Sequence, residues 1–188
     1  GRVHESSYDE YQRGLDFCAR HPLWLSNQDL PIIQSFTNST HHTKSVLIPL
    51  NSQNYYYEVT IKSLGSHAVA GIGFACGPYP DFRLPGHHRL SVGVHSDDGH
   101  KFFENSFGGI SFTDPFKQGD TIGVGYDHDD VYYTKNGRFI GAAFQDVLTT
   151  HRFYACVGID KHGSLALNFG ETPFLYVNDD VKLPMYHR

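Results

Sequence analysis

The chain has 188 residues and a formal net charge of −5, and 39% of its residues are hydrophobic. This length predicts one domain, or one domain with an arm. The acidic balance argues against nucleic acid as a partner, because phosphates attract a basic surface. No apolar run reaches the roughly 20 residues of a membrane helix, so we expect any membrane attachment to come from a segment outside this chain.

Residues 1–43 predict a helical or irregular N-terminal arm. Tyr8, Tyr11 and Leu15 recur at helical spacing, and Pro22 ends the pattern. Apolar residues between 23 and 36 have the character of packing anchors. We therefore expect the arm to lie against the main domain.

From residue 44 the pattern changes to short strands separated by turns every 8–12 residues. In "NYYYEVTIK" the residues Tyr55, Tyr57, Val59 and Ile61 alternate, which predicts a half-buried strand. "TKNGRF" places Asn-Gly between two alternating runs, which is typical of a tight hairpin because both residues tolerate positive φ. These patterns predict an all-β, antiparallel sandwich over residues 44–176, followed by a C-terminal tail over 177–188.

Several motifs occur together in a recognisable order: "YYYEVTI", "AGIGFA", "RLPG", "SVGVHSDDG", "GDTIGVGYD", "VYYTKNGRFIGAAF" and "LNFGETPF". In this order and spacing the chain resembles the SPRY domain over about residues 44–176. The loop "GPYPDFRLPGHHRLSVG" is similar to that of the fungal endosomal and vacuolar adaptors that recruit a WW-domain HECT ubiquitin ligase. "HSDDGHKFF" and "NFGETPF" are similar to the Ran-binding protein M branch. The resemblance implies a bent sandwich that is not an enzyme, needs no cofactor, and holds a protein or peptide ligand on loops at one end.

The connection before "SVG" is the main candidate for the partner surface. It is long for a link between neighbouring strands, it contains three prolines that stiffen it, and it carries Tyr and Arg, which often anchor interfaces. The alternative is that its aromatic residues cap the core and its polar residues are solvated. The residues predicted to contact a partner here are Tyr79, Phe82, Arg83, Leu84, His87 and His88.

A second candidate is the turn "DKHG" between the last two predicted strands, with Lys161 and His162. The resemblance implies that this turn faces the same surface as the long loop, and scaffold loops often carry function. A plain solvated hairpin is the alternative.

Neither a metal site nor a catalytic site is predicted. "HSDDGH" groups His95, Asp97, Asp98 and His100, but side chains on a strand alternate between faces, and Asp-Asp-Gly is ordinary turn chemistry. No GxSxG or HExxH motif occurs. A metal enzyme that uses the histidine-rich face is the competing hypothesis from another class.

The tail contains the tetrapeptide Leu183-Pro184-Met185-Tyr186. WW domains recognise such LPxY segments, in which the proline docks an aromatic groove and the tyrosine fills a neighbouring pocket. Leu183, Pro184 and Tyr186 are therefore predicted to dock a WW-domain ubiquitin ligase. The alternative is that Leu183, Met185 and Tyr186 strap the tail to the sandwich.

Together these features predict the substrate-binding part of an adaptor that brings membrane cargo to a WW-domain HECT ligase for endosomal or vacuolar sorting. Its expected location is the cytosolic face of the endosome or vacuole membrane. The alternative within the same class is a Ran-binding-protein-M-type subunit of a multi-subunit ubiquitin ligase.

Overall fold

The computed structural model describes residues 56–65, 67–75, 83–105, 108–127, 130–145, 154–161, 163–170 and 172–177, and the backbone of 33–34 and 43–49. The helix expected near residues 6–21 and the LPxY tetrapeptide lie outside these residues.

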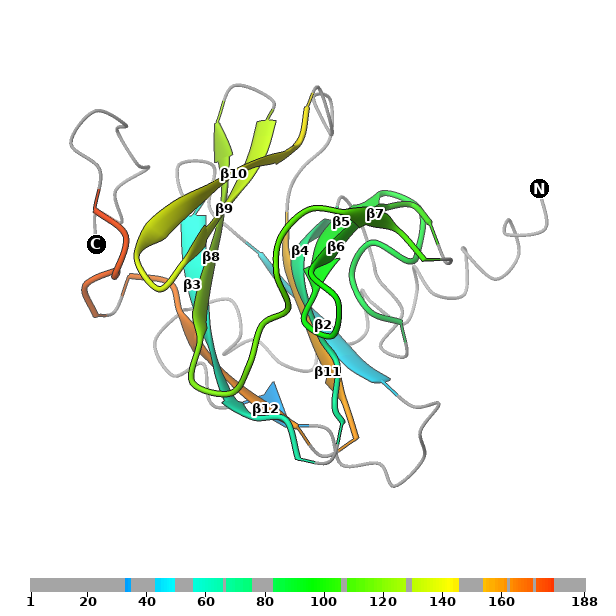
Figure 1. The fold of residues 1–188 in the computed structure, drawn as a ribbon, viewed down its shortest axis with the longest axis horizontal. Coiled ribbons are helices and arrows are strands. Elements are labelled where there is room, and N and C mark those ends of the chain that lie inside the picture. Colours follow the sequence, from blue (N-terminus) through cyan, green and yellow to red (C-terminus); the bar gives the residue numbers. More distant parts are fainter. Residues whose placement is uncertain are drawn as a thin grey trace.

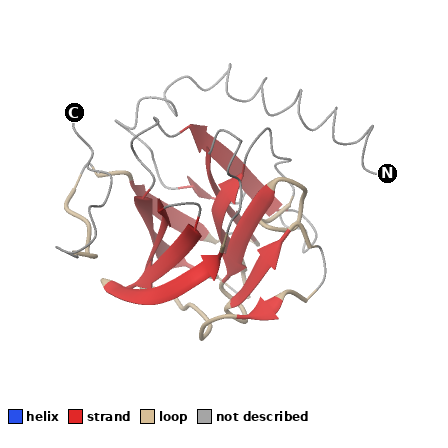
Figure 2. Cartoon of the chain, turned by 90° about the horizontal axis from the view of Figure 1, so that it is seen from above, coloured by secondary structure: helices blue, strands red, loops and turns tan. Residues whose placement is uncertain are grey.

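The described strands form two six-stranded antiparallel sheets that face each other (Figure 1). In order, sheet A contains β1 (Ile33–Gln34), β12 (Ser164–Asn168), β3 (Tyr56–Ser63), β8 (Thr121–Asp127), β9 (Asp130–Lys135) and β10 (Arg138–Phe144). Sheet B contains β2 (Thr43–Pro49), β11 (Tyr154–Asp160), β4 (Ala70–Ala75), β5 (Ser91–His95), β6 (His100–Phe103) and β7 (Ile110–Ser111). The described segments contain strands and loops and no helix (Figure 2), and accordingly none that could cross a membrane. The prediction of an all-β antiparallel sandwich is confirmed.

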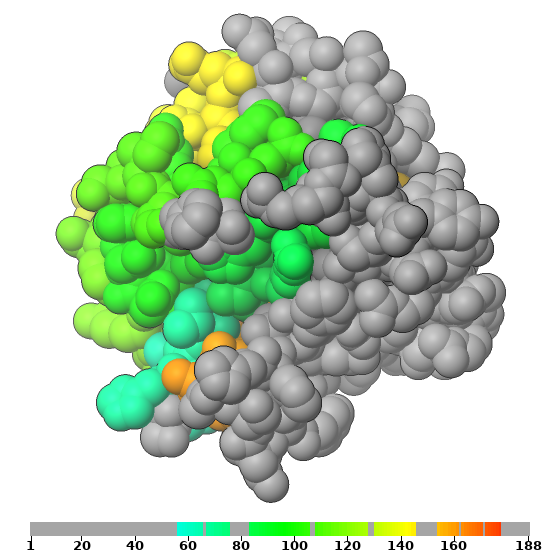
Figure 3. All heavy atoms as spheres, turned by 90° about the vertical axis from the view of Figure 1, so that its right-hand side faces the viewer, coloured from blue at the N-terminus to red at the C-terminus, as the bar shows by residue number. Residues whose placement is uncertain are grey.

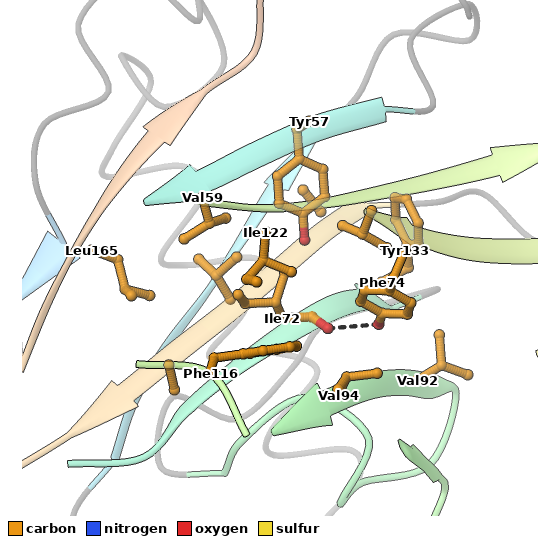
Figure 4. Packing of buried hydrophobic residues seen from close by; sticks show 14 of the residues in the cluster. Tyr57, Val59, Ile72, Phe74, Val92, Val94, Phe116, Ile122, Tyr133 and Leu165 are labelled. Carbon is orange, nitrogen blue, oxygen red and sulfur yellow. Dashed lines mark hydrogen bonds between the residues drawn. The ribbon is translucent and has the colours of Figure 1, made fainter. Parts of the chain in front are cut away.

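Alternating apolar residues of both sheets meet in one core (Figure 4). Two buried tyrosines bring hydroxyl groups into it, and each hydroxyl finds a backbone acceptor. Tyr133 donates to the carbonyl of Ile72 at 2.7 Å, the dashed line in Figure 4, and Tyr57 donates to that of Gly73 at 2.5 Å. Both bonds run from sheet A to β4 of sheet B, so they join the two layers as well as satisfying buried polar atoms.

The predicted Asn-Gly hairpin is confirmed between β9 and β10. Asn136 and Gly137 have φ of 51° and 83°, the left-handed values that a type I′ turn needs. The side-chain oxygen of Asn136 also accepts the backbone N–H of Thr121 at 2.8 Å. This residue therefore shapes the turn and fixes the start of β8.

The half-buried character predicted for β3 is wrong. Tyr56 and Glu58, which face away from the core, are 0% and 3% exposed, because residues 172–177 cross the outer face of sheet A and cover them. We call residues 172–177 the C-terminal strap; it lies on the left of Figure 1 in orange and red. The Glu58 carboxylate accepts the Tyr56 hydroxyl at 2.7 Å and the backbone N–H groups of Leu175 and Tyr176 at 2.9 and 3.1 Å.

The connections between strands gather at two opposite ends of the sandwich. In sheet B, Ala75 of β4 pairs with Ser91 of β5 and with Tyr154 of β11, whereas Ala70 pairs with Ile159. The chain therefore leaves β2, β4, β6, β8 and β10 at one end, which we call the loop end. It leaves β3, β5, β7, β9 and β11 at the other end, the turn end.

Candidate protein-binding surface

The outer face of sheet B carries glycine at three positions of β4 and β5. Gly71 and Gly73 alternate with the core residues of β4, and Gly93 does so on β5. Residues 83–90, which we call the folded-back loop, lie on this face. A Cβ atom at Gly71 would come within 2.8 Å of Pro85 Cδ, and one at Gly93 within 2.9 Å of Pro85 Cβ. Only glycine therefore lets the loop pack directly on the strand backbones.

Hydrogen bonds fasten the folded-back loop to β5. The Pro85 carbonyl accepts His95 Nε2 at 2.8 Å, and the Ser91 hydroxyl accepts the backbone N–H of Gly86 at 3.0 Å. The same hydroxyl donates to the carbonyl of His88 at 2.5 Å. Buried side chains thus satisfy the backbone of the loop, which fixes its path over the sheet.

A ring cluster from three segments supports the loop from β5 and β6. The His95 ring stacks on Phe102 with centroids 4.0 Å apart, and His87 meets both rings edge-on at 4.6 and 4.9 Å. His87 Nδ1 lies 2.9 Å from the carbonyl of Asn105. Because carbonyl oxygens only accept, His95 carries a proton on Nε2 and His87 on Nδ1.

Where the loop enters β5, Leu90 has a strained backbone conformation that a hydrogen bond stabilises. Leu90 has φ of 59°, a left-handed conformation that costs a non-glycine residue about 1 kcal/mol or more. Its backbone N–H donates to Glu104 Oε2 at 2.7 Å. This charge-assisted bond holds Leu90 in its unfavourable conformation.

Burial keeps two histidines neutral, His88 in the loop and His95 beneath it on β5. The pKa of His95 falls to about 4 because burial disfavours its charged form, and neighbouring His87 adds to the effect. The pKa of His88 also falls to about 4 through burial, followed by repulsion from the Arg83 and Arg89 guanidinium groups. Both rings are therefore uncharged at neutral pH.

The predicted contact residues of this loop divide into two groups. Leu84 and His88 are 7% and 3% exposed, so in this conformation they support the loop from below. Arg83 and His87 are half-buried, and Arg83 lies with one guanidinium nitrogen 3.2 Å from His88 Nδ1. Tyr79 and Phe82 lie outside the described residues.

The loop also offers a cation that sequence reasoning did not single out. Arg89 is exposed. It sits in the same basic and histidine-rich stretch, so its charge was visible, but its outward direction was not. Figure 3 looks onto this side of the molecule, where the green atoms of the folded-back loop and of strands β5 to β7 lie together.

Lys161 lies at the turn end of sheet B. The turn after β11 belongs to the turn end, whereas connection 76–90 starts at the loop end, about 17 Å away along the six residues of β4. Lys161 Nζ lies 3.4 Å from the carbonyl of His67. The described part of the folded-back loop packs on Gly71, next to the turn-end residue Ala70 of β4. His162 lies outside the described residues.

The histidine and aspartate group of "HSDDGH" does not converge on a point. His95 points under the folded-back loop, whereas His100 Nδ1 lies 2.8 Å from the carbonyl of Gly108. Asp98 accepts the backbone N–H of His100 at 2.9 Å, as a turn residue does. Within the described parts of the chain, no three His, Cys, Asp or Glu side chains are arranged to hold a metal ion.

Comparisons with known proteins give a consistent assignment. The chain is 33% identical over 142 residues to Protein ssh4 of Aspergillus clavatus, covering 72% of this chain and 27% of that protein. It is 38% identical over 132 residues to the Ran-binding proteins 9/10 homolog of Drosophila melanogaster, covering 69% of this chain and 13% of that protein. The chain thus spans less than a third of the length of either relative.

Solved structures share the fold. A human SPRY domain matches with a TM-score of 0.65 at 23% identity, covering 77% of this chain and 95% of that one. The SPRY domain of human HERC1 matches with a TM-score of 0.59 at 17% identity, covering 76% of this chain and 90% of that one. The SPRY domain family model matches residues 54–172, which is more than half of the chain. The chain therefore belongs to the SPRY domain family.

Proposed function

We propose that this SPRY domain binds a protein or peptide segment through the folded-back loop and the neighbouring connections of the loop end, without catalysis. SPRY domains are protein-interaction modules. The observation that carries the proposal is a loop held from below by buried hydrogen bonds, with the Arg89 side chain exposed and the Arg83 and His87 side chains partly accessible. A loop that is ordered in advance loses little entropy on binding, and arginine is a frequent interface anchor.

The more specific part of the proposal is an adaptor role. The domain would select the cytosolic segment of a membrane protein and bring it to a WW-domain HECT ubiquitin ligase for endosomal or vacuolar sorting. The similarity to Protein ssh4 from several fungi, at 30–33% identity, and the LPxY tetrapeptide at 183–186 support this role. The site of action would be the cytosolic face of the endosome or vacuole membrane, reached through a segment outside this chain.

A second candidate is a SPRY subunit of a multi-subunit ubiquitin ligase of the Ran-binding protein M type. The observation that favours it is the 38% and 37% identity to a Ran-binding proteins 9/10 homolog of the fly and to Ran-binding protein 10 of zebrafish. Both candidates share the recognition surface and differ in the machinery that is recruited.

Affinity capture from cell extract tests both the proposed binding surface and the proposed adaptor role. The baits are the unchanged domain, Arg83→Ala with Arg89→Ala, Tyr186→Ala, and the matched control Lys62→Ala, which removes an exposed cation from β3 of sheet A. We expect the loop variant alone to lose membrane cargo and Tyr186→Ala alone to lose a WW-domain ligase. Loss of a multi-subunit ligase instead would favour the second candidate. A captured set that no variant changes would contradict the proposed surface.

A further inference from the structure

An apolar patch lies where the edges of the two sheets meet. Phe103 of β6 and Ile110 of β7 are 46% and 65% exposed. Ile110 pairs with Lys101, and Lys101 and Phe103 stand two residues apart on one strand, so all three side chains share a face. The Phe103 ring lies 6.3 Å from that of Phe144 on β10, which joins the patch to sheet A. We call Lys101, Phe103 and Ile110 the edge patch.

A half-buried cation lies within these apolar groups. Lys101 Nζ donates to the carbonyl of Ala143 at 2.8 Å and lies 5.8 and 6.0 Å from the ring centres of Phe112 and Phe144. An ammonium group has three N–H donors, and the described residues supply one oxygen acceptor for it. A carboxylate would satisfy a further donor, and its attraction to the ammonium is stronger here than in open water because apolar rings exclude solvent.

The edge patch and the folded-back loop lie on opposite faces of β6, at the edge of sheet B. Phe102, on the opposite face of β6, belongs to the ring cluster under that loop. Asn105, just beyond β6, donates its backbone N–H to the carbonyl of Gly86 at 2.9 Å. A segment that binds the loop would therefore reach the edge patch by passing around the β6–β7 edge of sheet B.

The position also suits an extended ligand. β7 is the last strand of sheet B and β10 the last strand of sheet A in the described order. Extended peptides bind at such edges because their backbone runs parallel to the strand while alternate side chains enter neighbouring pockets.

We propose that the edge patch binds an extended acidic and apolar protein segment, with a carboxylate on Lys101 and apolar side chains on Phe103 and Ile110. This inference rests on the proposed function, because it names the chemistry of a segment that the same domain recognises. It adds a site on β6 and β7, outside the loop predicted to contact the partner.

The test is an NMR titration of the isotopically labelled domain with defined peptides. The probe is an eight-residue peptide of alternating Glu and Leu with blocked ends. The two control peptides replace every Glu by Lys or every Leu by Ala. We expect shifts of the backbone signals of β6 and β7 with the Glu-Leu peptide, and affinities at least about fivefold weaker with either control.

Three domain variants locate the binding. Lys101→Gln keeps a donor for the Ala143 carbonyl but removes the charge, and Phe103→Ser removes the exposed ring. Each variant should bind the Glu-Leu peptide with an affinity about fivefold lower or weaker still. Phe139→Ser is the matched control, because Phe139 of sheet A is 56% exposed but packs near Tyr132 of the same sheet and Tyr176 of the strap. It should leave the affinity unchanged.

Several outcomes would overturn the inference. Equal binding of the Lys-Leu peptide, or unchanged affinity in Lys101→Gln, would show that the cation does not select the ligand. Self-association that Phe103→Ser abolishes, without peptide binding, would show that a second copy occupies the patch. If capture of cellular partners depends on Arg83 and Arg89 but not on Lys101, the proposed function stands and this inference fails. If capture depends on none of the three, both fail.

Discussion

Gly93→Ala should displace the folded-back loop without touching the core. Gly93 does not have a positive φ, so alanine fits its backbone. The new Cβ would overlap the Pro85 carbonyl oxygen and lie 2.8 Å from the carbonyl carbon, whereas ordinary contacts begin near 3.4 Å. Pro85 would have to move by about half an ångström or more, which in a packed site costs about 1–3 kcal/mol.

The displacement would also weaken the bond between His95 Nε2 and the Pro85 carbonyl. An unsatisfied buried donor costs about 1–3 kcal/mol. Allowing for partial relaxation, we expect the free energy of unfolding to fall by about 2–4 kcal/mol in total. Urea unfolding measures this change directly.

Gly108→Ala provides the control. No heavy atom lies within 4 Å of a Cβ built at Gly108, so its free energy of unfolding should stay within about 0.5 kcal/mol of the unchanged protein. A Gly93→Ala protein as stable as Gly108→Ala would refute the close packing of loop and sheet.

Three further predictions follow from polar side chains that hydrogen-bond the backbone or change their protonation on folding. Glu58→Ala leaves the backbone N–H groups of the strap without their acceptor. It should lower the free energy of unfolding by about 2–3 kcal/mol and speed hydrogen exchange at the Tyr176 amide. Unchanged exchange at Tyr176 would contradict the role of Glu58. Because the pKa values of His88 and His95 are about 4 in the folded chain and about 6.5 in unfolded chains, the folded state binds fewer protons between these values. The free energy of unfolding should therefore be highest above pH 6.5 and fall towards pH 4 by up to about 3 kcal/mol for each ring. His95→Gln should flatten this pH dependence, which urea unfolding at a series of pH values measures. Asn136→Ala, which places a residue without a side-chain acceptor at φ of 51°, should lower the free energy of unfolding by about 1–2 kcal/mol; a melting temperature equal to that of the unchanged protein would argue against this role.

Local patterns explain why the strands could be predicted closely. The alternation in "YYYEVTI" and the Asn136-Gly137 pair depend on neighbours in sequence, and the structure has β3 and the β9–β10 turn at these places. β1 was not predicted, because its two residues are specified by pairing with Ser164 and Leu165, far along the chain. The two-residue β7 was missed for the same reason, since its partner strand defines it.

The covered outer faces were the larger omission. Alternation in β3 indicated one apolar face, but the Tyr56 and Glu58 face is also buried, because the strap returns from more than 110 residues away. A usable signal existed for sheet B. Gly71, Gly73 and Gly93 recur at alternate positions, and a strand face made of glycine is typical of close backbone approach.

The candidate surface could be predicted as a segment but not residue by residue. Length, prolines and charge marked the loop that the structure shows folded over sheet B. The direction of each side chain depended on tertiary packing, so Leu84 and His88 proved buried while Arg89 is exposed. Composition carries no information on which side of an irregular segment faces the sheet.

Photo-crosslinking in cells tests the central claim most directly. A photoreactive amino acid is placed at Arg89 on the folded-back loop and, in a second protein, at the exposed Lys62 on β3. If the loop-bearing face of sheet B recognises a protein segment, irradiation yields a discrete crosslinked partner from position 89 and none from position 62. The same products from both positions, or none from position 89, would contradict the account.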